Sequence, residues 1–192
     1  MAVTDRSLPE DTKDIAWLYL PAEDCQIERA LLRAGIYIEN MRLQYIDSEL
    51  PAVLVELECT ESIFELNGLC ASIQELDDGC YQKAAAALQM SCPANLTQAW
   101  NLLSQIDLFD FVPGVSSPKE YGRYMIRESG YFEYDDELDE FYAFKKYGEQ
   151  RIAREYGLFT EAGYVSYHGF ISIDEVMAGI ETERMNMTMG EI

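Results

Sequence analysis

Carboxylates are the side chains whose number and spacing in this sequence could do chemistry. The 192 residues include 35 Asp and Glu against 14 Lys and Arg, which gives a formal net charge of -21 at pH 7. The acids are densest between residues 133 and 140, near the end of an acidic and aromatic stretch that begins at Ser104. Grouped carboxylates can bind calcium, act in pairs as acid and base, or bind the cationic side chains of another protein.

Calcium loops of the EF-hand type do not fit this acidic block. A loop that starts at Asp135 needs glycine at its sixth position, where this sequence has Glu140. A loop that starts at Asp174 has the required glycine, but it places apolar residues at two of the ligand positions. We therefore predict no metal site.

Catalytic motifs are absent as well. The sequence contains no GxxxxGK[ST], GxGxxG, HExxH or GxSxG motif, and its single histidine, His168, restricts histidine-based catalysis. Two carboxylates at a set separation can hydrolyse glycosides, and Tyr131, Phe132 and Tyr134 could line a sugar site, but 35 acids give such a pair no specificity. We predict a protein without catalytic residues or a cofactor, and keep a carboxylate-based hydrolase as an alternative.

The negative charge predicts a basic protein partner. It argues against direct binding to nucleic acid or to an anionic membrane, because both attract the opposite charge. B-DNA carries one negative charge per about 1.7 Å of axis, so a net charge of -21 corresponds to about 36 Å of duplex. Carboxylates three or four residues apart on a helix have Cβ atoms about 5 to 6 Å apart, close to the interval of about 7 Å between phosphates. Acidic rows on packed helices can therefore present a DNA-like pattern of charge.

We predict a partner-binding, DNA-mimicking surface made of acidic residues from several parts of the chain. Crowding of these like charges is expected to raise the pKa of several carboxyl groups. The predicted residues are Asp47, Glu49, Glu65, Glu75, Asp77, Asp78, Asp107, Asp110, Glu120, Glu133, Asp135, Asp136, Glu137, Asp139 and Glu140.

The cysteines and the N-terminus predict a cytoplasmic protein. Five cysteines at wide spacing, with no CxxC pair, are typical of reduced thiols. The opening MAVTDRSLPEDTKD lacks the apolar stretch of a signal peptide, and the longest apolar run, from Ile15 to Leu20, is too short to span a bilayer.

Hydrophobic periodicity predicts an α+β fold in which a small N-terminal α/β unit precedes two mainly helical units. We place these units at residues 1–60, 61–112 and 113–192. The elements expected in the first unit are a frayed start (1–14), a strand (15–20), a helix (23–33) and a second strand (41–46).

Capping signals define the central helices. Ser62 with Glu65 forms a capping box that opens a helix to about Leu76, and further helices are expected over residues 80–90 and 95–104. This central unit is expected to be a small helical bundle with a strongly negative outside.

The third unit also begins with a capping signal. Ser117, a following proline and Glu120 open a helix that Gly130 is expected to end. After the acidic block we expect two helical segments broken at Gly148 and then a hairpin, with the helical segments at 141–147 and 149–156 and the hairpin turn at 161–163. The residues from 181 onward are expected to be loose.

Three stretches of the sequence resemble the ArdA antirestriction proteins carried by conjugative elements. They are SIFELNGLCASIQELDD, LLSQIDLFDFVPGVSSPKEYGRYMIRESG and AFKKYGEQRIAREYGLFTEAGYV, and the resemblance runs from about Ile15 to Tyr167. Its most specific parts are the capping-box helix, the acidic and aromatic segment with its PGV turn, and a YG followed by GxFTxxGYV. The residues of this last part are Tyr147, Gly148, Gly157, Phe159, Thr160, Gly163, Tyr164 and Val165.

This resemblance implies an elongated protein of three parts that forms a homodimer resembling bent B-DNA. It also implies the function, which is to occupy the DNA-binding groove of type I restriction-modification enzymes, or of other DNA-binding defence complexes, without any chemistry. The family's antirestriction motif falls on residues 102–113, where Ser104, Gln105 and Ile106 replace the typical run of glutamates and Asp107 and Asp110 remain.

A second hypothesis is an acidic adaptor that binds a basic protein partner unrelated to DNA enzymes. Competition with duplex DNA separates the two hypotheses, because only a mimic of DNA should be displaced from its target by DNA.

Overall fold

The protein is an elongated α+β chain. The computed structural model describes residues 1–9, 12–44, 46–47, 50–56 and 62–180. Within these residues the helices are α1 (Asp24–Ala34), α2 (Ala52–Glu56), α3 (Ile63–Gln74), α4 (Asp78–Ser91), α5 (Leu96–Ser104), α6 (Pro118–Arg127), α7 (Phe144–Ile152) and α8 (Ile173–Met177). The strands are β1 (Ala2–Asp5), β2 (Ala16–Trp17), β3 (Met41–Gln44), β4 (Phe109–Pro113), β5 (Tyr156–Phe159) and β6 (Gly163–Tyr167). Three short 3-10 helices are η1 (Ile38–Asn40), η2 (Ile106–Leu108) and η3 (Asp136–Leu138).

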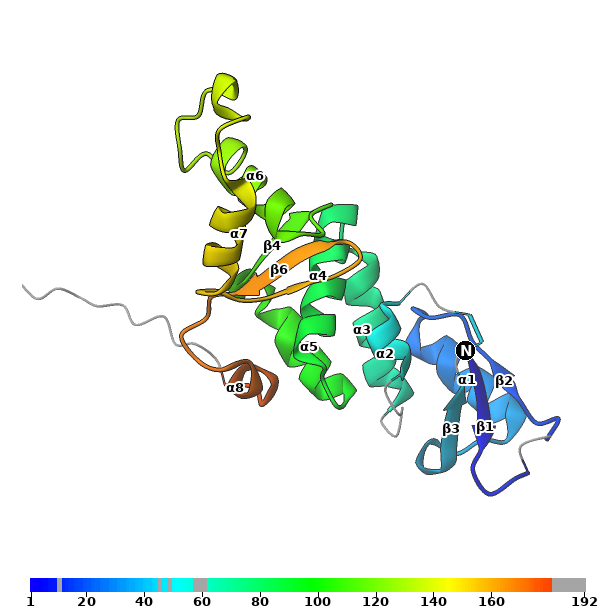
Figure 1. Cartoon of the computed structure of the whole chain (residues 1–192). Helices are drawn as coiled ribbons and strands as arrows, with labels where there is room; N and C mark the ends of the chain where they lie inside the picture. Colours follow the sequence, from blue (N-terminus) through cyan, green and yellow to red (C-terminus); the bar gives the residue numbers. More distant parts are fainter. Residues whose placement is uncertain (10–11, 45, 48–49, 57–61, 181–192) are drawn as a thin grey trace, which may run out of the picture.

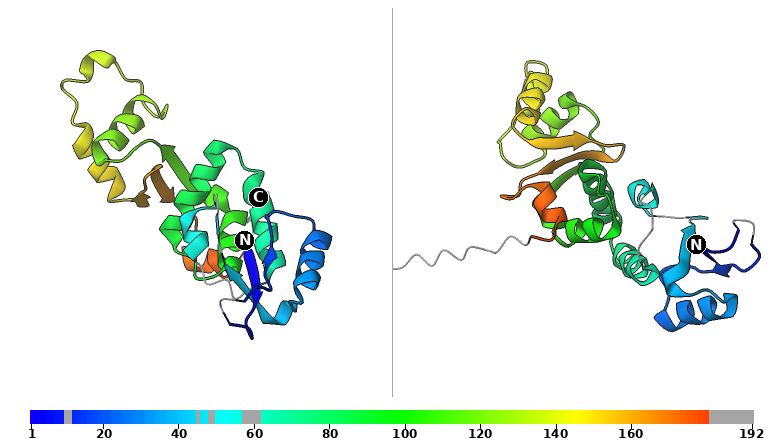
Figure 2. Two further views of the ribbon diagram at one scale, coloured as in Figure 1. Left: turned by 90° about the vertical axis from the view of Figure 1, so that its right-hand side faces the viewer. Right: turned by 90° about the horizontal axis from the view of Figure 1, so that it is seen from below.

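The helices and sheets follow one another along an extended body. Figure 1 shows the first sheet and α1 at one end, α3, α4 and α5 in the middle, and α6 and α7 at the other end. Figure 2 shows the same extended arrangement from two further directions. The predicted fold class is therefore confirmed. No helix in the described part of the chain is both long and apolar enough to cross a membrane.

The first sheet is antiparallel and has the strand order β2-β1-β3. Its central strand is β1, in which Val3 is fully buried in one core cluster with Ile27 of α1. The predicted frayed start is therefore wrong for residues 2–5, because the sheet and α1 bury this short apolar segment. Strand β2 is shorter than predicted, since only Ala16 and Trp17 pair with β1.

Side-chain caps begin the central helices. The predicted capping box forms only in part, because Ser62 accepts from the Phe64 N–H and not from that of Glu65, and the cap by Asp77 was not predicted. The side chains of Ser62, Asp77 and Asn95 accept hydrogen bonds from backbone N–H groups in the first turns of α3, α4 and α5. These caps satisfy N–H groups that have no partner within the helix. They fix where each helix starts and thereby place Glu65 and Asp78 on the first turns of α3 and α4.

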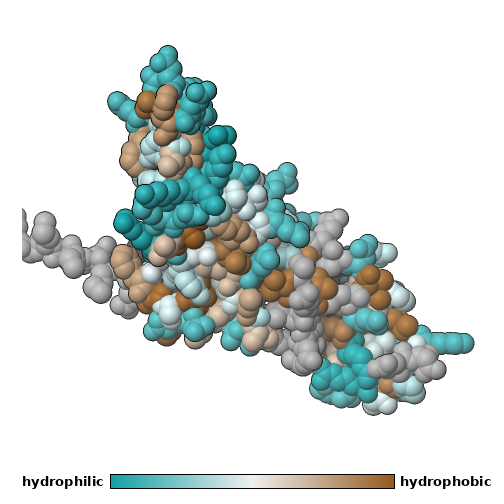
Figure 3. Space-filling view, viewed as in Figure 1, coloured by the Kyte–Doolittle hydropathy of each residue, from teal (hydrophilic) through white to brown (hydrophobic). Residues whose placement is uncertain are grey.

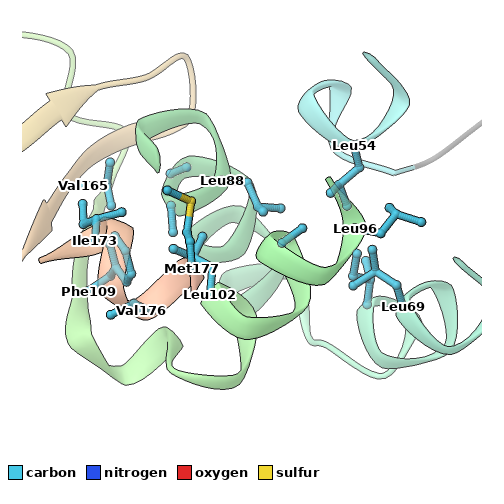
Figure 4. Packing of buried hydrophobic residues seen from close by; sticks show 14 of the residues in the cluster. Leu54, Leu69, Leu88, Leu96, Leu102, Phe109, Val165, Ile173, Val176 and Met177 are labelled. Carbon is cyan, nitrogen blue, oxygen red and sulfur yellow. The ribbon is translucent and has the colours of Figure 1, made fainter. Parts of the chain in front are cut away.

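One hydrophobic core joins the central helices to the second sheet and to α8. Leu102 of α5, Phe109 of β4, Val165 of β6 and Val176 of α8 are all fully buried in it. Figure 4 shows these side chains gathered between the helices and the sheet. The second sheet is antiparallel with the order β4-β6-β5, so the predicted division after residue 112 falls inside strand β4.

Helices α6 and α7 cross at two glycines. A Cβ atom added at Gly122 would overlap the carbonyl oxygen of Phe144, and one added at Gly148 would overlap the carbonyl oxygen of Pro118. Helix α7 runs without interruption through Gly148. The predicted break at Gly148 is therefore wrong, because this glycine allows two helix backbones to touch inside the structure.

Helix α6 begins as predicted and ends early. The Ser117 hydroxyl accepts a hydrogen bond from the Glu120 N–H at 3.4 Å. The Glu120 carboxylate accepts from the N–H and the hydroxyl of Ser116, at 2.8 and 2.9 Å, so the reciprocal bond of the cap is shifted by one residue. The helix ends at Arg127, before the predicted Gly130.

The GxFTxxGYV stretch builds the hairpin between β5 and β6. Thr160 Oγ1 donates a hydrogen bond to the Gly163 carbonyl at 2.9 Å and accepts one from the Gly163 N–H at 3.2 Å. These bonds close the predicted turn over residues 161–163, which is confirmed. A Cβ atom at Gly157 would overlap the Tyr164 hydroxyl. This part of the resemblance, the GxFTxxGYV stretch, therefore has a structural role in this chain.

A partly buried hydrogen-bond network ties α6 and α7 to the second sheet. The Tyr121 hydroxyl donates to the Glu155 carboxylate at 2.7 Å, and Arg151 pairs with the other oxygen of that carboxylate at 2.7 Å. Burial, together with the charge of Glu155 and a hydrogen bond to it, raises the pKa of Tyr164 to about 12. Burial and the hydrogen bond to Glu155 also raise the pKa of Tyr121.

We expect the free energy of unfolding to fall as the pH rises from about 10 to about 12. An unfolded tyrosine ionises near pH ~10, whereas folded Tyr164 keeps its proton to about pH 12, so the folded chain binds more protons in this window. The loss should reach about 1 kcal/mol per tyrosine by pH ~11, measured by urea denaturation, and be absent below pH ~9.

Two variants test the origin of this alkaline loss. The double variant Tyr121→Phe, Tyr164→Phe should flatten the fall in stability with pH. The matched control Tyr156→Phe changes an exposed tyrosine and should leave the fall unchanged. An equally steep fall in the double variant would show that other groups cause it.

Candidate functional site

The predicted acidic residues lie on the surface along the length of the molecule. In the part of the chain that the structure describes, every one is solvent-exposed except Asp139, which is half-buried. Glu49 lies outside the described residues. The others stand after β3, on or beside α3 and α4, on η2 and β4, on α6, and between α6 and α7. They therefore follow the long axis of the molecule (Figure 1).

The densest carboxylates occupy the segment between α6 and α7, residues 128–143, which we call the acidic tip. Arg127, at the end of α6, pairs with Asp136 and, at 3.0 Å, with Asp139. Asp139 also accepts a hydrogen bond from the Tyr134 hydroxyl at 3.0 Å, and Asp135 caps η3 by accepting from the Glu137 N–H at 3.0 Å. Part of the acidic block therefore shapes its own turn.

Three glutamates of the acidic tip have no such role. Glu133, Glu137 and Glu140 are exposed, and none of them forms an ion pair with another described residue. Large apolar side chains stand beside them, with Tyr131 75% and Phe141 84% exposed. Figure 3 shows apolar residues surrounded by hydrophilic ones at this end of the molecule. This combination suits a partner surface that offers both cationic and apolar groups.

A second group of acids gathers at the start of α4. Asp77 caps the helix by accepting from the Cys80 N–H at 2.7 Å, and Asp78 lies in the first turn. The hydrogen bond and charge of Asp77, with a smaller contribution from the charge of Asp107, raise the pKa of the Cys80 thiol. Asp107, from η2, thus adds to the negative charge that acts on Cys80 in the first turn of α4.

The remaining predicted acids are not part of either group. Glu65 and Glu75 are exposed on α3 and at its end, and Glu120 is engaged in the cap of α6. Asp110 of β4 lies 3.3 Å from Nδ1 of His168, which is an exposed loop residue after β6.

The pKa values of two of the predicted carboxylates are lowered, whereas crowding of like charges was expected to raise them. Hydrogen bonds from Cys80 hold the pKa of Asp77 below its usual value, and those from Ser116 do the same for Glu120. The prediction that crowding raises carboxylate pKa values is therefore wrong for these two groups. The cause is that each carboxylate accepts hydrogen bonds at a helix N-terminus, where the charged form is favoured.

The chemistry that this surface can do is the binding of cations carried by a partner. Among the described residues no group of three or more His, Cys, Asp or Glu side chains is arranged to hold a metal ion. The carboxylates are spread over several elements and face solvent, so each can meet a Lys or Arg of another molecule.

Sequence reasoning missed two parts of this surface. Arg127 was visible as one of few bases in an acidic segment, but its pairing with Asp136 and Asp139 depends on how the tip turns back on α6. The exposed aromatics Trp17 and Tyr19 were assigned to a strand, and the sequence does not show that their side chains stay uncovered.

The fold and the surface together define an elongated, acidic α+β protein. The family model described as Antirestriction protein (ArdA) matches residues 15–166 of the chain. This protein therefore belongs to the ArdA family of antirestriction proteins. No curated protein matches the chain.

Proposed function

We propose that this protein inhibits type I restriction-modification enzymes by occupying their DNA-binding groove as a mimic of B-DNA. The exposed carboxylates take the places of DNA phosphates and meet the Lys and Arg side chains that normally hold the duplex. Inhibition is competitive and involves no bond making or breaking. Its site of action is the cytoplasm, where these enzymes meet DNA.

The observation that carries this proposal is the distribution of the acids over an elongated body. Exposed carboxylates from the segment after β3 to the tip beyond α6 follow the long axis, and the central residues 61–112 contain only one base, Lys83. A duplex presents charge in the same extended manner, whereas a compact acidic globule does not. Membership of an antirestriction family supports the same target.

We also propose that the active form is a homodimer. The net charge of one chain matches about 36 Å of duplex, so two chains end to end match about two helical turns. Sedimentation equilibrium measures this directly, and a mass equal to a single chain of 21.9 kDa at the concentrations that inhibit would contradict it.

Competition with duplex DNA tests the function. A purified type I enzyme is titrated with this protein in the presence of increasing concentrations of its recognition duplex. A mimic should be displaced by the duplex, and the apparent inhibition constant should rise in proportion to the DNA concentration. If the complex formed equally well at every DNA concentration, the acidic adaptor would be the better description.

We expect inhibition to weaken as salt is added. Contacts between carboxylates and a basic groove are screened, because the Debye length falls from about 30 Å at 0.01 M to about 8 Å at 0.15 M salt. Affinity should fall at least about tenfold between about 50 and 200 mM salt, by analogy with the salt dependence of phosphate contacts. Fluorescence anisotropy of the labelled protein with the enzyme measures this slope, and a flat profile would exclude a mainly electrostatic interface.

A further inference from the structure

A groove lies between the N-terminal sheet and the central helices, far along the chain from the acidic tip. Its volume is about 640 Å³, which is enough for two or three large side chains. Its walls are residues 17–21 at and after β2, the described residues Ile46, Asp47 and Leu50 after β3, and side chains from the end of α3 and the start of α4. We call it the inter-unit groove.

Apolar side chains in the wall of this groove are left uncovered. Trp17 is 60%, Tyr19 93% and Ile46 55% exposed, and Leu76 stands opposite them at the end of α3. A single exposed aromatic residue is ordinary, but several around one groove are typical of a surface that a partner covers. The groove therefore offers apolar area that the folded chain does not bury itself.

The charged side chains at this groove have one sign. Asp47 and Asp78 are the charged side chains among its described lining, and both are exposed, while the α-ammonium group of Met1, which also lines the groove, donates a hydrogen bond to the Leu18 carbonyl at 3.0 Å. Glu75 and Asp77, which follow α3 and cap α4, add negative charge beside it. An occupant must bring positive charge as well as apolar side chains, because the groove offers both an apolar wall and carboxylates that form no ion pair with another described residue.

We propose that the inter-unit groove binds a basic amphipathic segment of the partner protein. An apolar side chain of that segment sits against Trp17, Tyr19 and Ile46, and its Lys or Arg side chains reach Asp47 and Asp78. Arginine suits the site well, because its guanidinium stacks on Trp or Tyr while pairing with a carboxylate. The inference rests on the proposed function, since an enzyme groove built to hold DNA carries such cationic segments.

Other occupants fit the groove less well. A second copy of this chain carries the same net charge of -21, so its approach to an acidic groove is opposed. A small molecule is usually bound by convergent buried polar groups, whereas the charged side chains here, Asp47 and Asp78, are exposed.

A peptide assay tests the groove without any restriction enzyme. The Trp100→Phe variant leaves Trp17 as the only tryptophan, and hence as a fluorescent reporter inside the groove. The probe is a peptide of about 12 residues in which lysine and leucine alternate, and its control replaces every leucine by glycine at the same charge. We expect the leucine peptide to shift Trp17 emission to shorter wavelength and to bind at least about tenfold more tightly than the glycine peptide.

Two pairs of variants separate the apolar wall from the carboxylates. Tyr19→Ser with Ile46→Ser should weaken the leucine peptide about tenfold and leave the glycine peptide unchanged. Asp47→Asn with Asp78→Asn should weaken both peptides and reduce the salt dependence of binding. The matched control Phe170→Ser changes a fully exposed aromatic residue outside the groove and should change neither.

Three results would overturn the inference. Equal affinity for the leucine and glycine peptides would reduce the interaction to charge alone. Unchanged peptide binding in the Tyr19→Ser, Ile46→Ser variant, folded by circular dichroism, would place the site elsewhere. Dissociation of a dimer by that same variant would make the groove a contact between copies. If the peptides do not bind, the groove inference is wrong, but the proposed inhibition of the enzyme is not affected. If the peptides bind but the protein does not inhibit a type I enzyme, the proposed function is wrong and the groove still binds a basic segment.

Discussion

Replacing Gly148 by alanine should unfold the end of the molecule that carries the acidic tip. The added Cβ atom overlaps the Pro118 carbonyl of α6, which is main chain and cannot move aside as a flexible side chain would. The two helices must separate, and their aromatic contacts with the tip, such as the ring pair of Phe132 and Tyr147 at 6.1 Å, are lost with them. We expect a loss of about 3 kcal/mol or more, and a thermal midpoint lower by about 10 °C.

A second helical glycine provides the matched control for this change. Gly68 lies in α3, and an added Cβ atom meets only the ring of Trp100, at 3.8 Å. Gly68→Ala should therefore be neutral or raise stability by up to about 1 kcal/mol, because alanine has the higher helix propensity. Differential scanning calorimetry of both variants measures the contrast. Equal midpoints for the two variants would contradict the close crossing of α6 and α7.

Local signals predicted the helices well because their causes are local. Ser62 and Asn95 cap helices through bonds to residues a few positions away, so the sequence contains both partners. Strand β1 was missed for the opposite reason. The segment AVTD is short and polar at its end, and only pairing on both edges with β2 and β3 makes it a central strand. A break at Gly148 was predicted because glycine often ends helices, whereas here the neighbouring helix requires it.

The sequence predicts which acidic residues lie on the candidate surface better than it predicts how they are arranged there. Acidic residues in a chain of this charge are bound to be exposed, and the structure places those that it describes at the surface. The effect of the Asp107 charge on Cys80 and the pairing of Asp139 with Arg127 depend on tertiary packing, which spacing along the chain does not show. Helix α8 likewise buries Val176 against the core from a region outside the family resemblance.

Neutralising the exposed carboxylates of the acidic tip should cost most of the inhibition of a type I enzyme. The structure separates those that only face solvent from Asp136 and Asp139, whose pairing with Arg127 shapes the tip. Each exposed charge contributes a fraction of a kcal/mol to a screened interface, and four together about 2.7 kcal/mol, or about 100-fold in the inhibition constant. The variant that leaves these ion pairs intact combines Glu133→Gln, Asp135→Asn, Glu137→Gln and Glu140→Gln. Asp135 also caps η3, and asparagine keeps the side-chain oxygen that accepts this bond.

A control variant with the same net charge tests whether inhibition depends on the position of the carboxylates or only on the net charge. It combines four exposed acids outside the predicted surface, Asp14→Asn, Glu28→Gln, Glu39→Gln and Glu161→Gln. Both variants have the same net charge, so a protein that acts only through its overall field should lose the same inhibition in each case. A mimic that presents charge at defined positions should lose about 100-fold at the tip and less than about threefold in the control. The inhibition constant against a purified type I enzyme at fixed salt measures both, and an equal loss would refute the assignment of the tip as a contact surface.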